Sequence, residues 1–326
     1  MNSIARSPIL APLAALLLVA AIAAFTTPRF LDAGNLSNLA LQVSIISIVA
    51  IGSTFVILTG GIDLSPGSAI ALMTMVFAVS IKFWGLPLPV AIAMTIVLGG
   101  FLGALLGVTS AYLRIPAFIS TLAALSAFRG VAFMFNNGSP VFSVHPSLEY
   151  IFYGKLGGLP LPLFYLVALY GIAWYTLKYT AFGRSVYAVG GNPAAAKLSG
   201  LNVKRTQFFA FVIAGATAGI ATILMAARLN SGSPNYGVGL ELSAIAAAVI
   251  GGASLAGGRG NIINTFIGAL TIVIVQNGLN LNAVPTSIQT VVIGAIIVLA
   301  VGIDMWRNEL GAIMKRVFKI FRSSKN

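Results

Sequence analysis

Long apolar runs follow one another along this chain, each separated from the next by a short polar or glycine-rich connection. A helix needs about 20 apolar residues to cross a bilayer, and a lipid interior has no water to satisfy a backbone that is not helical. The chain is 58% hydrophobic and only 8% charged, whereas a soluble domain carries about 25% charged residues. The sequence therefore predicts an all-α polytopic membrane protein, with residues 1–326 forming a single transmembrane domain.

Ten apolar segments are expected within 8–303, placed by the polar and proline-containing breaks between them. The first is too long for a signal peptide and is followed by no convincing small-residue cleavage site. Two segments, 68–84 and 242–256, are short, and either of them is a candidate re-entrant or broken helix. The expected segments are 8–27, 39–59, 68–84, 90–112, 117–135, 161–178, 206–228, 242–256, 262–280 and 286–303.

The positive charges are distributed unevenly between the two sides of this arrangement. Ten spans place both termini on one side, and most of the 19 Lys and Arg fall on that side, including a basic tail at 304–326. Because cytoplasmic loops carry the excess of Lys and Arg, we expect both termini in the cytoplasm. The same asymmetry explains the net charge of +13 without a nucleic-acid partner. The residues on this side are Arg6, Arg114, Lys178, Arg184, Lys197, Lys204, Arg205, Arg259, Arg307, Lys315, Arg316, Lys319, Arg322 and Lys325.

The stretch 178–205 is a basic polar interruption without an acidic residue, and its loop, 179–205, is expected in the cytoplasm. Its middle predicts one short helix. Asn192 is a good N-cap, Pro193 suits the first helical position, three alanines favour the helix, and Gly200 is placed to end it. A short basic helix between apolar runs indicates a docking element.

Several kinds of chemistry have no signature here. There is no GxxxxGK[ST] phosphate-binding loop, no HExxH and no cysteine, so neither a nucleotide site nor a metal site is expected in this chain. The polar loop with Ser139, His145 and Glu149 is read as solvated rather than as a hydrolytic triad, which argues against a membrane enzyme. The six acids lie at or beyond segment ends, which also argues against ion-coupled transport, because that usually needs ionisable groups deep in the membrane.

A few polar residues do fall inside or near the ends of spans. Arg129 either lines a water-filled cavity or pairs across helices, or it lies nearer the membrane interface than the segment bounds suggest. Gln276, Asn277 and Asn280 carry neutral donors and acceptors suited to sugar hydroxyls, and they are equally suited to hydrogen bonds between helices. We keep these four as candidate residues of a substrate pathway.

An internal echo links GGIDLSPG at 60–67 with GGASLAGG at 251–258. Both follow a long apolar segment, and repeats are common in transporters, but the glycine-rich match is short, so a duplication stays a hypothesis. The motif residues are Gly60, Gly61, Asp63, Ser65, Gly67, Gly251, Gly252, Gly257 and Gly258.

Three stretches carry a resemblance to a known family. GGIDLSPGS, AFGRSVYAVGGNPAAAKLSGLNVKR and the run ELSAIAAAVIGGASLAGGRGNIINTFIGAL with QNGLNLNAV resemble the membrane permease of ribose-type ATP-binding-cassette sugar importers. The resemblance extends from about 28 to 304, with the motifs in matching order and spacing. The first 27 residues and the tail carry no such signature.

This resemblance implies a non-catalytic permease of the bacterial inner membrane that works by alternating access. The implied partners are a second permease copy or paralogue, a cytoplasmic ATPase that binds ATP-Mg, a periplasmic sugar-binding protein and membrane lipid. The sugar stays open among ribose, other pentoses and related compounds, and an ion-coupled secondary sugar transporter is the alternative. The implied ATPase-coupling residues are Gly183, Arg184, Gly190, Gly191, Asn192, Pro193, Ala194, Ala195, Ala196, Lys197 and Gly200.

Overall fold

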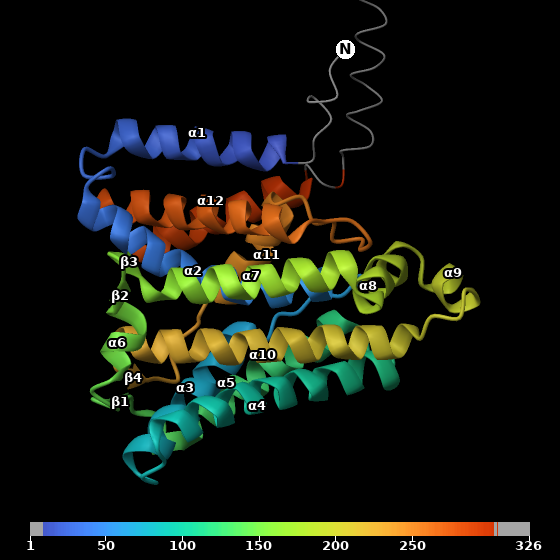
Figure 1. Ribbon diagram of the computed structural model, residues 1–326, viewed down its shortest axis with the longest axis horizontal. Helices are drawn as coiled ribbons and strands as arrows, with labels where there is room; N and C mark the ends of the chain where they lie inside the picture. The colour runs from blue at the N-terminus through green and yellow to red at the C-terminus, as the bar shows by residue number, and fades with distance from the viewer. Residues whose placement is uncertain (1–8, 303–304, 306–326) are drawn as a thin grey trace, which may run out of the picture.

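The computed structural model describes residues 9–302 and 305, and its long helices lie side by side across the molecule (Figure 1). The short helices α8 (Ala181–Gly191) and α9 (Pro193–Leu198) are at one end, which we call the basic end. Four two-residue strands and α6 (Leu148–Tyr153) lie at the opposite end, which we call the strand end. The predicted basic tail, 304–326, falls outside the described residues apart from Met305.

Apolar helices correspond to all ten predicted segments. They are α1 (Leu10–Thr26), α2 (Ala33–Leu58), α3 (Pro66–Lys82), α4 (Leu88–Gly107) with the π-helical turn η2 (Val108–Tyr112), α5 (Ala117–Met134) with η3 (Phe135–Gly138), α7 (Leu161–Tyr179), α10 (Val203–Leu229), α11 (Leu240–Ile250), α12 (Ile262–Leu281) and the helix Thr286–Gly302. Two antiparallel strand pairs join β1 (Val141–Phe142) to β4 (Ser231–Gly232) and β2 (Lys155–Leu156) to β3 (Leu159–Pro160).

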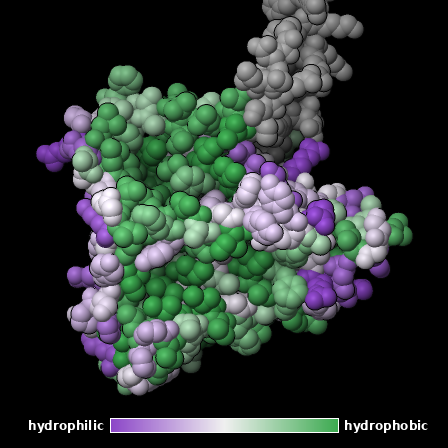
Figure 2. Space-filling model, in the orientation of Figure 1, coloured by the Kyte–Doolittle hydropathy of each residue, from purple (hydrophilic) through white to green (hydrophobic). Residues whose placement is uncertain are grey.

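The all-α prediction is confirmed, and the surface has the polarity of a membrane protein. In the part of the chain that the structure describes, six helices are long and apolar enough to cross a membrane, namely α2, α4, α5, α7, α10 and α12. Four further apolar helices are shorter. Figure 2 shows a broad hydrophobic face between polar groups at the two ends of the helices, as expected where lipid surrounds the middle of a bundle.

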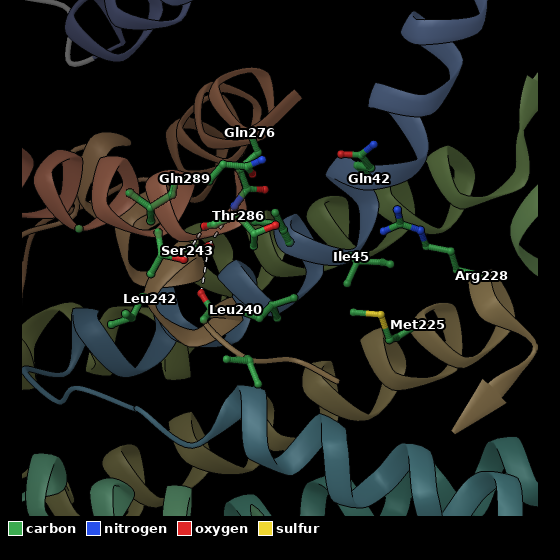
Figure 3. A pocket seen from close by; sticks show the side chains of 16 residues that line it. Gln42, Ile45, Met225, Arg228, Leu240, Leu242, Ser243, Gln276, Thr286 and Gln289 are labelled. Carbon is green, nitrogen blue, oxygen red and sulfur yellow. Dashed lines mark hydrogen bonds between the residues drawn. The ribbon is translucent and has the colours of Figure 1, made fainter. Parts of the chain in front are cut away.

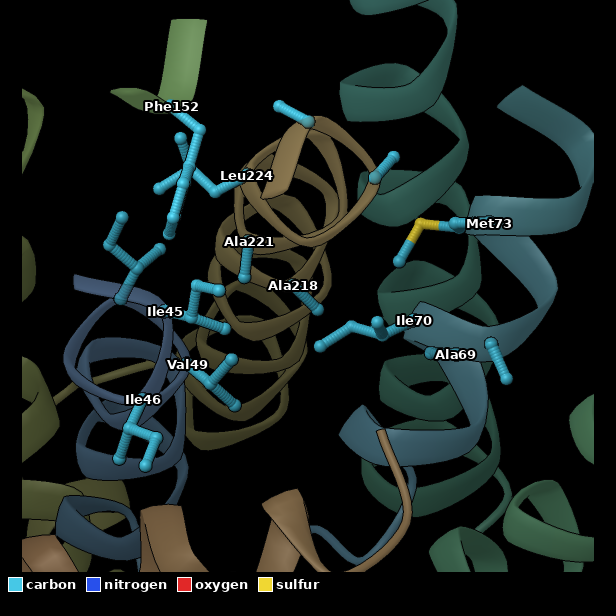
Figure 4. Packing of buried hydrophobic residues seen from close by; sticks show 14 of the residues in the cluster. Ile45, Ile46, Val49, Ala69, Ile70, Met73, Phe152, Ala218, Ala221 and Leu224 are labelled. Carbon is cyan, nitrogen blue, oxygen red and sulfur yellow. The ribbon is translucent and has the colours of Figure 1, made fainter. Parts of the chain in front are cut away.

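Helix α2 forms the centre of the bundle. Almost every residue from Val43 to Leu58 is buried, so this helix is apolar all round rather than amphipathic, as a helix enclosed on every side should be. Figure 4 shows Ile45, Ile46 and Val49 of α2 on one side of α10 and Ile70 and Met73 of α3 on the other.

Glycines bring α4 and α10 into close contact. A Cβ added to Gly99 would lie 2.3 Å from the carbonyl oxygen of Gly215, and one added to Gly103 would lie 2.2 Å from that of Phe211. Small residues let two helix backbones approach in lipid, where dispersion replaces the hydrophobic effect as the force that joins helices. The glycines of the predicted segment 90–112 therefore supply the surface on which α4 packs against α10.

The two short predicted segments are helices that follow a non-helical stretch. Residues 61–65 precede α3, and the turns of 233–239, which follow β4, precede α11. Helix α11 ends at Ile250 rather than near 256, because Gly251 packs against the backbone of α12 and Gly252 takes a positive φ of 87°. Its 11 residues extend only about 17 Å, less than the ~30 Å hydrocarbon core.

Candidate functional site

The basic segment forms two helices, each started by a polar side chain. The hydroxyl of Thr180 accepts a hydrogen bond from the backbone N–H of Gly183 at 3.1 Å and begins α8. Asn192 accepts one from the N–H of Ala195 at 3.0 Å and begins α9, with Pro193 in its first turn. Gly200, with φ 82°, follows the last turn. The predicted short helix and its capping residues are confirmed, and α8 is an additional helix.

Helix α9 projects from the basic end (Figure 1) and offers a small apolar surface. Ala194, Ala195 and Lys197 are exposed, as predicted for a docking face, and Leu198 is 90% exposed. Ala196 is instead buried, with 4% of its surface exposed, so this alanine packs inward rather than facing outward. An exposed leucine beside alanines and a lysine is suited to contact with another protein.

A glycine junction joins the basic segment to the membrane helices. A Cβ on Gly190 would lie 1.8 Å from the carbonyl oxygen of Leu58 and 2.5 Å from the nitrogen of Gly258. The N–H of Gly258 donates to that same Leu58 carbonyl at 3.0 Å. A Cβ on Gly257 would lie 2.9 Å from the nitrogen of Gly60. The end of α8 thus touches the end of α2 and the loop after α11, and the structure brings four of the predicted glycines together.

Further contacts stiffen the α8 side of this junction. The Tyr187 hydroxyl donates to the carbonyl of Gly260 at 3.1 Å, and burial raises the pKa of Tyr187 further above neutral. A Cβ on Gly183 would lie 2.3 Å from the carbonyl oxygen of Thr176, so α8 also packs closely against the end of α7. Arg184 is exposed nearby.

The remaining motif residues surround the start of α3 and the end of α11. Asp63 is buried, and its Oδ1 accepts hydrogen bonds from the N–H and the hydroxyl of Ser65 at 2.9 and 2.7 Å. These bonds hold the stretch before α3 in a tight turn. Gly61 approaches Val56 of α2 at 3.0 Å as measured from an added Cβ. The echo motifs therefore meet in space through Gly60 and Gly257, while their duplication stays a hypothesis.

A cavity of about 460 Å³ opens among α2, α10, α11, α12 and the helix Thr286–Gly302 (Figure 3). This volume is within the range of about 300–1,000 Å³ for small-molecule sites. Its lining mixes aliphatic side chains such as Ile45 and Leu242 with amides, hydroxyls and one guanidinium. The polar lining residues are Gln42, Arg228, Ser243, Gln276, Thr286, Gln289 and Thr290.

The amide side chains on one wall are linked to one another. Gln276 Nε2 donates to the Ser243 hydroxyl at 3.4 Å, and Gln289 Nε2 donates to Asn280 Oδ1 at 2.8 Å. Gln276 thus lines the cavity as a pathway residue would, whereas Asn280 does not line it and instead contacts the lining residue Gln289. Asn277 differs, because it is buried and exchanges two hydrogen bonds with Asn35 of α2. The structure gives Asn277 the interhelical role, which was the alternative prediction.

Arg129 forms hydrogen bonds that link α5 to another part of the chain. Its Nη1 donates to the carbonyl oxygens of Pro234 and Tyr236 at 2.5 and 2.7 Å, from α5 to the turns before α11. It does not line the 460 Å³ cavity, but the stretch it contacts does so through Val238 and Gly239.

Sequence reasoning missed most of the cavity lining. Gln42, Ser243 and Gln289 are single polar residues in apolar runs, and each has the structural reading of a helix-to-helix hydrogen bond. A helical-face analysis of 39–59 and 286–303 can identify them as inward candidates only if the partner helices are known. Leu198 was likewise not among the predicted site residues, although its exposure makes it part of the α9 surface.

Comparison with known proteins places the chain. The family described as branched-chain amino acid transport system / permease component matches residues 35–301. The chain belongs to this family. It is a multi-pass membrane permease, and its apolar helices and polar ends have the arrangement such a protein requires.

The related proteins are bacterial sugar permeases that match along nearly the whole chain. The ribose import permease protein of Escherichia coli (strain K12) is 44% identical over 90% of this chain and 92% of its own length. That of Bacillus subtilis (strain 168) is 39% identical, with 90% and 92% covered. The xylose transport system permease protein of Haemophilus influenzae is 37% identical, with 89% and 94% covered. No solved structure matches.

Proposed function

We propose that this chain is the transmembrane permease subunit of an ATP-driven importer for a monosaccharide, a ribose-like pentose or a related sugar. The observation that carries the proposal is 44% identity to a ribose import permease over 90% of the chain. Neither the family nor the relatives support an ion-coupled transporter. The chain makes no covalent chemistry in this proposal.

The cavity supplies the chemistry that a sugar needs. Amides and hydroxyls such as Gln276 and Ser243 donate and accept hydrogen bonds without charge, and the aliphatic walls contact the apolar faces of a sugar ring. A largely neutral lining suits a neutral substrate, because an unpaired charge facing a sugar would cost desolvation without a counter-charge. In this proposal a periplasmic sugar-binding protein delivers the substrate at the strand end.

The basic end is the proposed docking site of a cytoplasmic ATPase that binds ATP-Mg. Ala194, Ala195, Lys197 and Leu198 form the exposed face of α9, and Gly190 connects α8 to α2 and the loop after α11. A push on α9 is therefore transmitted to two membrane helices by backbone contacts. The proposal also includes the predicted ten membrane crossings, both termini in the cytoplasm, and a second permease copy or paralogue that completes the pathway.

Substitution of Ala195 by Glu tests the docking role. The added carboxylate places a bulky charge on the exposed face of α9 without disturbing the packing of Ala196, so we expect uptake of labelled ribose to be abolished while the protein still reaches the membrane. Uptake is measured in cells or proteoliposomes that contain the ATPase and the binding protein. Ala195→Ser, which adds one small neutral group, is the matched control and should keep normal uptake.

Two results of this experiment would oppose the proposal. Normal sugar uptake by Ala195→Glu would remove the docking role of α9. Uptake by the wild-type chain that is driven by an ion gradient, with no ATPase present, would overturn the ATP-driven importer itself.

A further inference from the structure

The stretch between β4 and α11 runs along helix α3 at backbone distance. The Thr74 hydroxyl donates to the carbonyl of Ser233 at 3.3 Å, and a Cβ on Gly232 would lie 2.3 Å from the Thr74 carbonyl oxygen. Further on, a Cβ on Gly237 would lie 2.4 Å from the carbonyl oxygen of Gly67. The segment 233–239, which we call the wall segment, is therefore pressed against α3 from Thr74 to Gly67.

The other side of the wall segment faces the cavity. Val238 and Gly239 line the 460 Å³ space, together with Leu240 at the start of α11, and Val238 is 76% exposed. Figure 3 shows Leu240 beside the cavity, at the point where the wall segment enters α11. The wall segment, a succession of turns, therefore contacts α3 through Ser233 and Gly237 and borders the cavity through Val238 and Gly239.

Arg129 supplies a polar contact that a non-helical segment in a membrane interior requires. Its Nη1 donates to the carbonyls of Pro234 and Tyr236, two groups that helical geometry would otherwise satisfy. In lipid each unpaired backbone group costs several kcal/mol. The hydrogen bonds from Arg129 to these two carbonyls therefore stabilise the position of the wall segment. Arg129 is also the one basic residue well inside a predicted span.

A second acceptor for this guanidinium lies close by. The Glu241 carboxylate interacts electrostatically with Arg129, and its Oε1 accepts a hydrogen bond from the N–H of Gly239 at 3.2 Å. Its Oε2 is buried and has no hydrogen-bond partner among the described residues. This oxygen is available to Arg129 when the wall segment leaves α3, so the charge has a partner in both arrangements.

We propose that the wall segment 233–239 is a gate of the sugar pathway and that Arg129 is the positioning residue that latches it against α3. The inference rests on the proposed function, because it gives that pathway its moving part. When the gate is latched, the carbonyls of Pro234 and Tyr236 accept from Arg129. When it opens, the guanidinium passes to Glu241 and the cavity extends past the segment.

Sugar leakage tests the latch. Wild-type and variant importers are reconstituted with their ATPase and binding protein in liposomes loaded with labelled ribose, and passive efflux is measured without ATP. Arg129→Gln removes hydrogen bonds from a charged donor, so we expect efflux about tenfold faster than wild type. Arg129→Lys keeps the charge on a differently shaped donor and should leak to an intermediate degree. Ser126→Gln, on the exposed face of the same helix, should stay tight.

The outcomes separate the gate from the permease. If wild type imports ribose with ATP and Arg129→Gln imports equally well without leaking, the latch is wrong and the proposed function stands. If wild type imports no sugar under these conditions, the proposed function fails before the latch is tested.

A cross-link tests the movement directly, also where Arg129→Gln fails to assemble. The chain has no cysteine, so Thr74→Cys with Ser233→Cys provides one disulfide between α3 and the wall segment. We expect oxidation to stop ribose uptake and a reductant to restore it, while each single variant transports in both conditions. Full uptake by the cross-linked protein would overturn the gate.

Discussion

At the scale of single residues, Gly190 links the proposed docking helix to the membrane helices. The position admits no side chain, since even one Cβ would overlap the Leu58 carbonyl oxygen at 1.8 Å. The neighbouring Gly191 has nothing within 4 Å of an added Cβ. Two adjacent glycines therefore serve different purposes, one for close backbone approach and the other at an exposed helix end.

Gly190→Ala should destabilise the basic end and Gly191→Ala should not. Forcing a methyl group into a packed backbone contact costs about 1–3 kcal/mol. The atoms it would meet, the Leu58 carbonyl oxygen and the Gly258 nitrogen, belong to the backbone and cannot rotate away. Thermal unfolding in detergent measures the effect, with a lower midpoint expected for Gly190→Ala alone. Equal midpoints for both variants would contradict the junction.

At the scale of helices, the α4–α10 pair is held by backbone proximity. Gly103 lies against the carbonyl of Phe211, and Gly215 lies against that of Gly99. A Cβ added to Gly100, on another face of α4, would have no neighbour within 4 Å. A single helix thus carries a packing face and a free face, both made of glycine. Its glycine content alone does not distinguish them.

Gly103→Leu should separate α4 from α10 and reduce the amount of folded permease, because a four-carbon side chain cannot enter a contact made by backbone atoms. Gly100→Leu adds the same volume where there is open space and should fold normally. The measurement is the folded fraction of each variant by size-exclusion chromatography in mild detergent. A well-folded Gly103→Leu protein would show that the helices can move apart without loss.

At the scale of the whole molecule, polar groups at both ends bound an apolar middle (Figure 2). The basic end carries Lys178, Arg184, Lys197, Lys204 and Arg205 in and around α8 and α9, whereas Lys155 on β2 lies at the strand end. Because positive charge collects on the cytoplasmic side of inner-membrane proteins, we propose that α9 faces the cytoplasm.

Cysteine labelling tests this orientation, since the natural chain offers no competing thiol. We expect Lys155→Cys to react with a membrane-impermeant thiol reagent in intact spheroplasts, and Lys197→Cys to react only in inside-out vesicles. Both side chains are exposed, so burial does not protect either one. The reverse pattern would invert the topology.

Features that depend on neighbouring residues could be predicted from the sequence. The ten apolar helices follow from local hydrophobicity, and α9 follows from Asn192, Pro193 and Gly200, because capping and turn geometry act over a few residues. The end of α11 was placed too late, since Gly251 ends that helix through its contact with α12, a partner distant in the chain. The second helix of the basic segment, α8, was also missed.

The functional arrangement required the tertiary structure. The cavity is assembled from five helices that span residues 42 to 294, and Arg129 finds its carbonyl partners more than 100 residues away. In an apolar chain nearly every residue type is compatible with either lipid or a neighbouring helix, so periodicity does not identify the partner. The sequence by itself determined which segments are helices and which end is basic, because local hydrophobicity and charge are short-range properties. Packing alone decided which polar side chains share a cavity and which glycines join α8 to α2 and to the loop after α11.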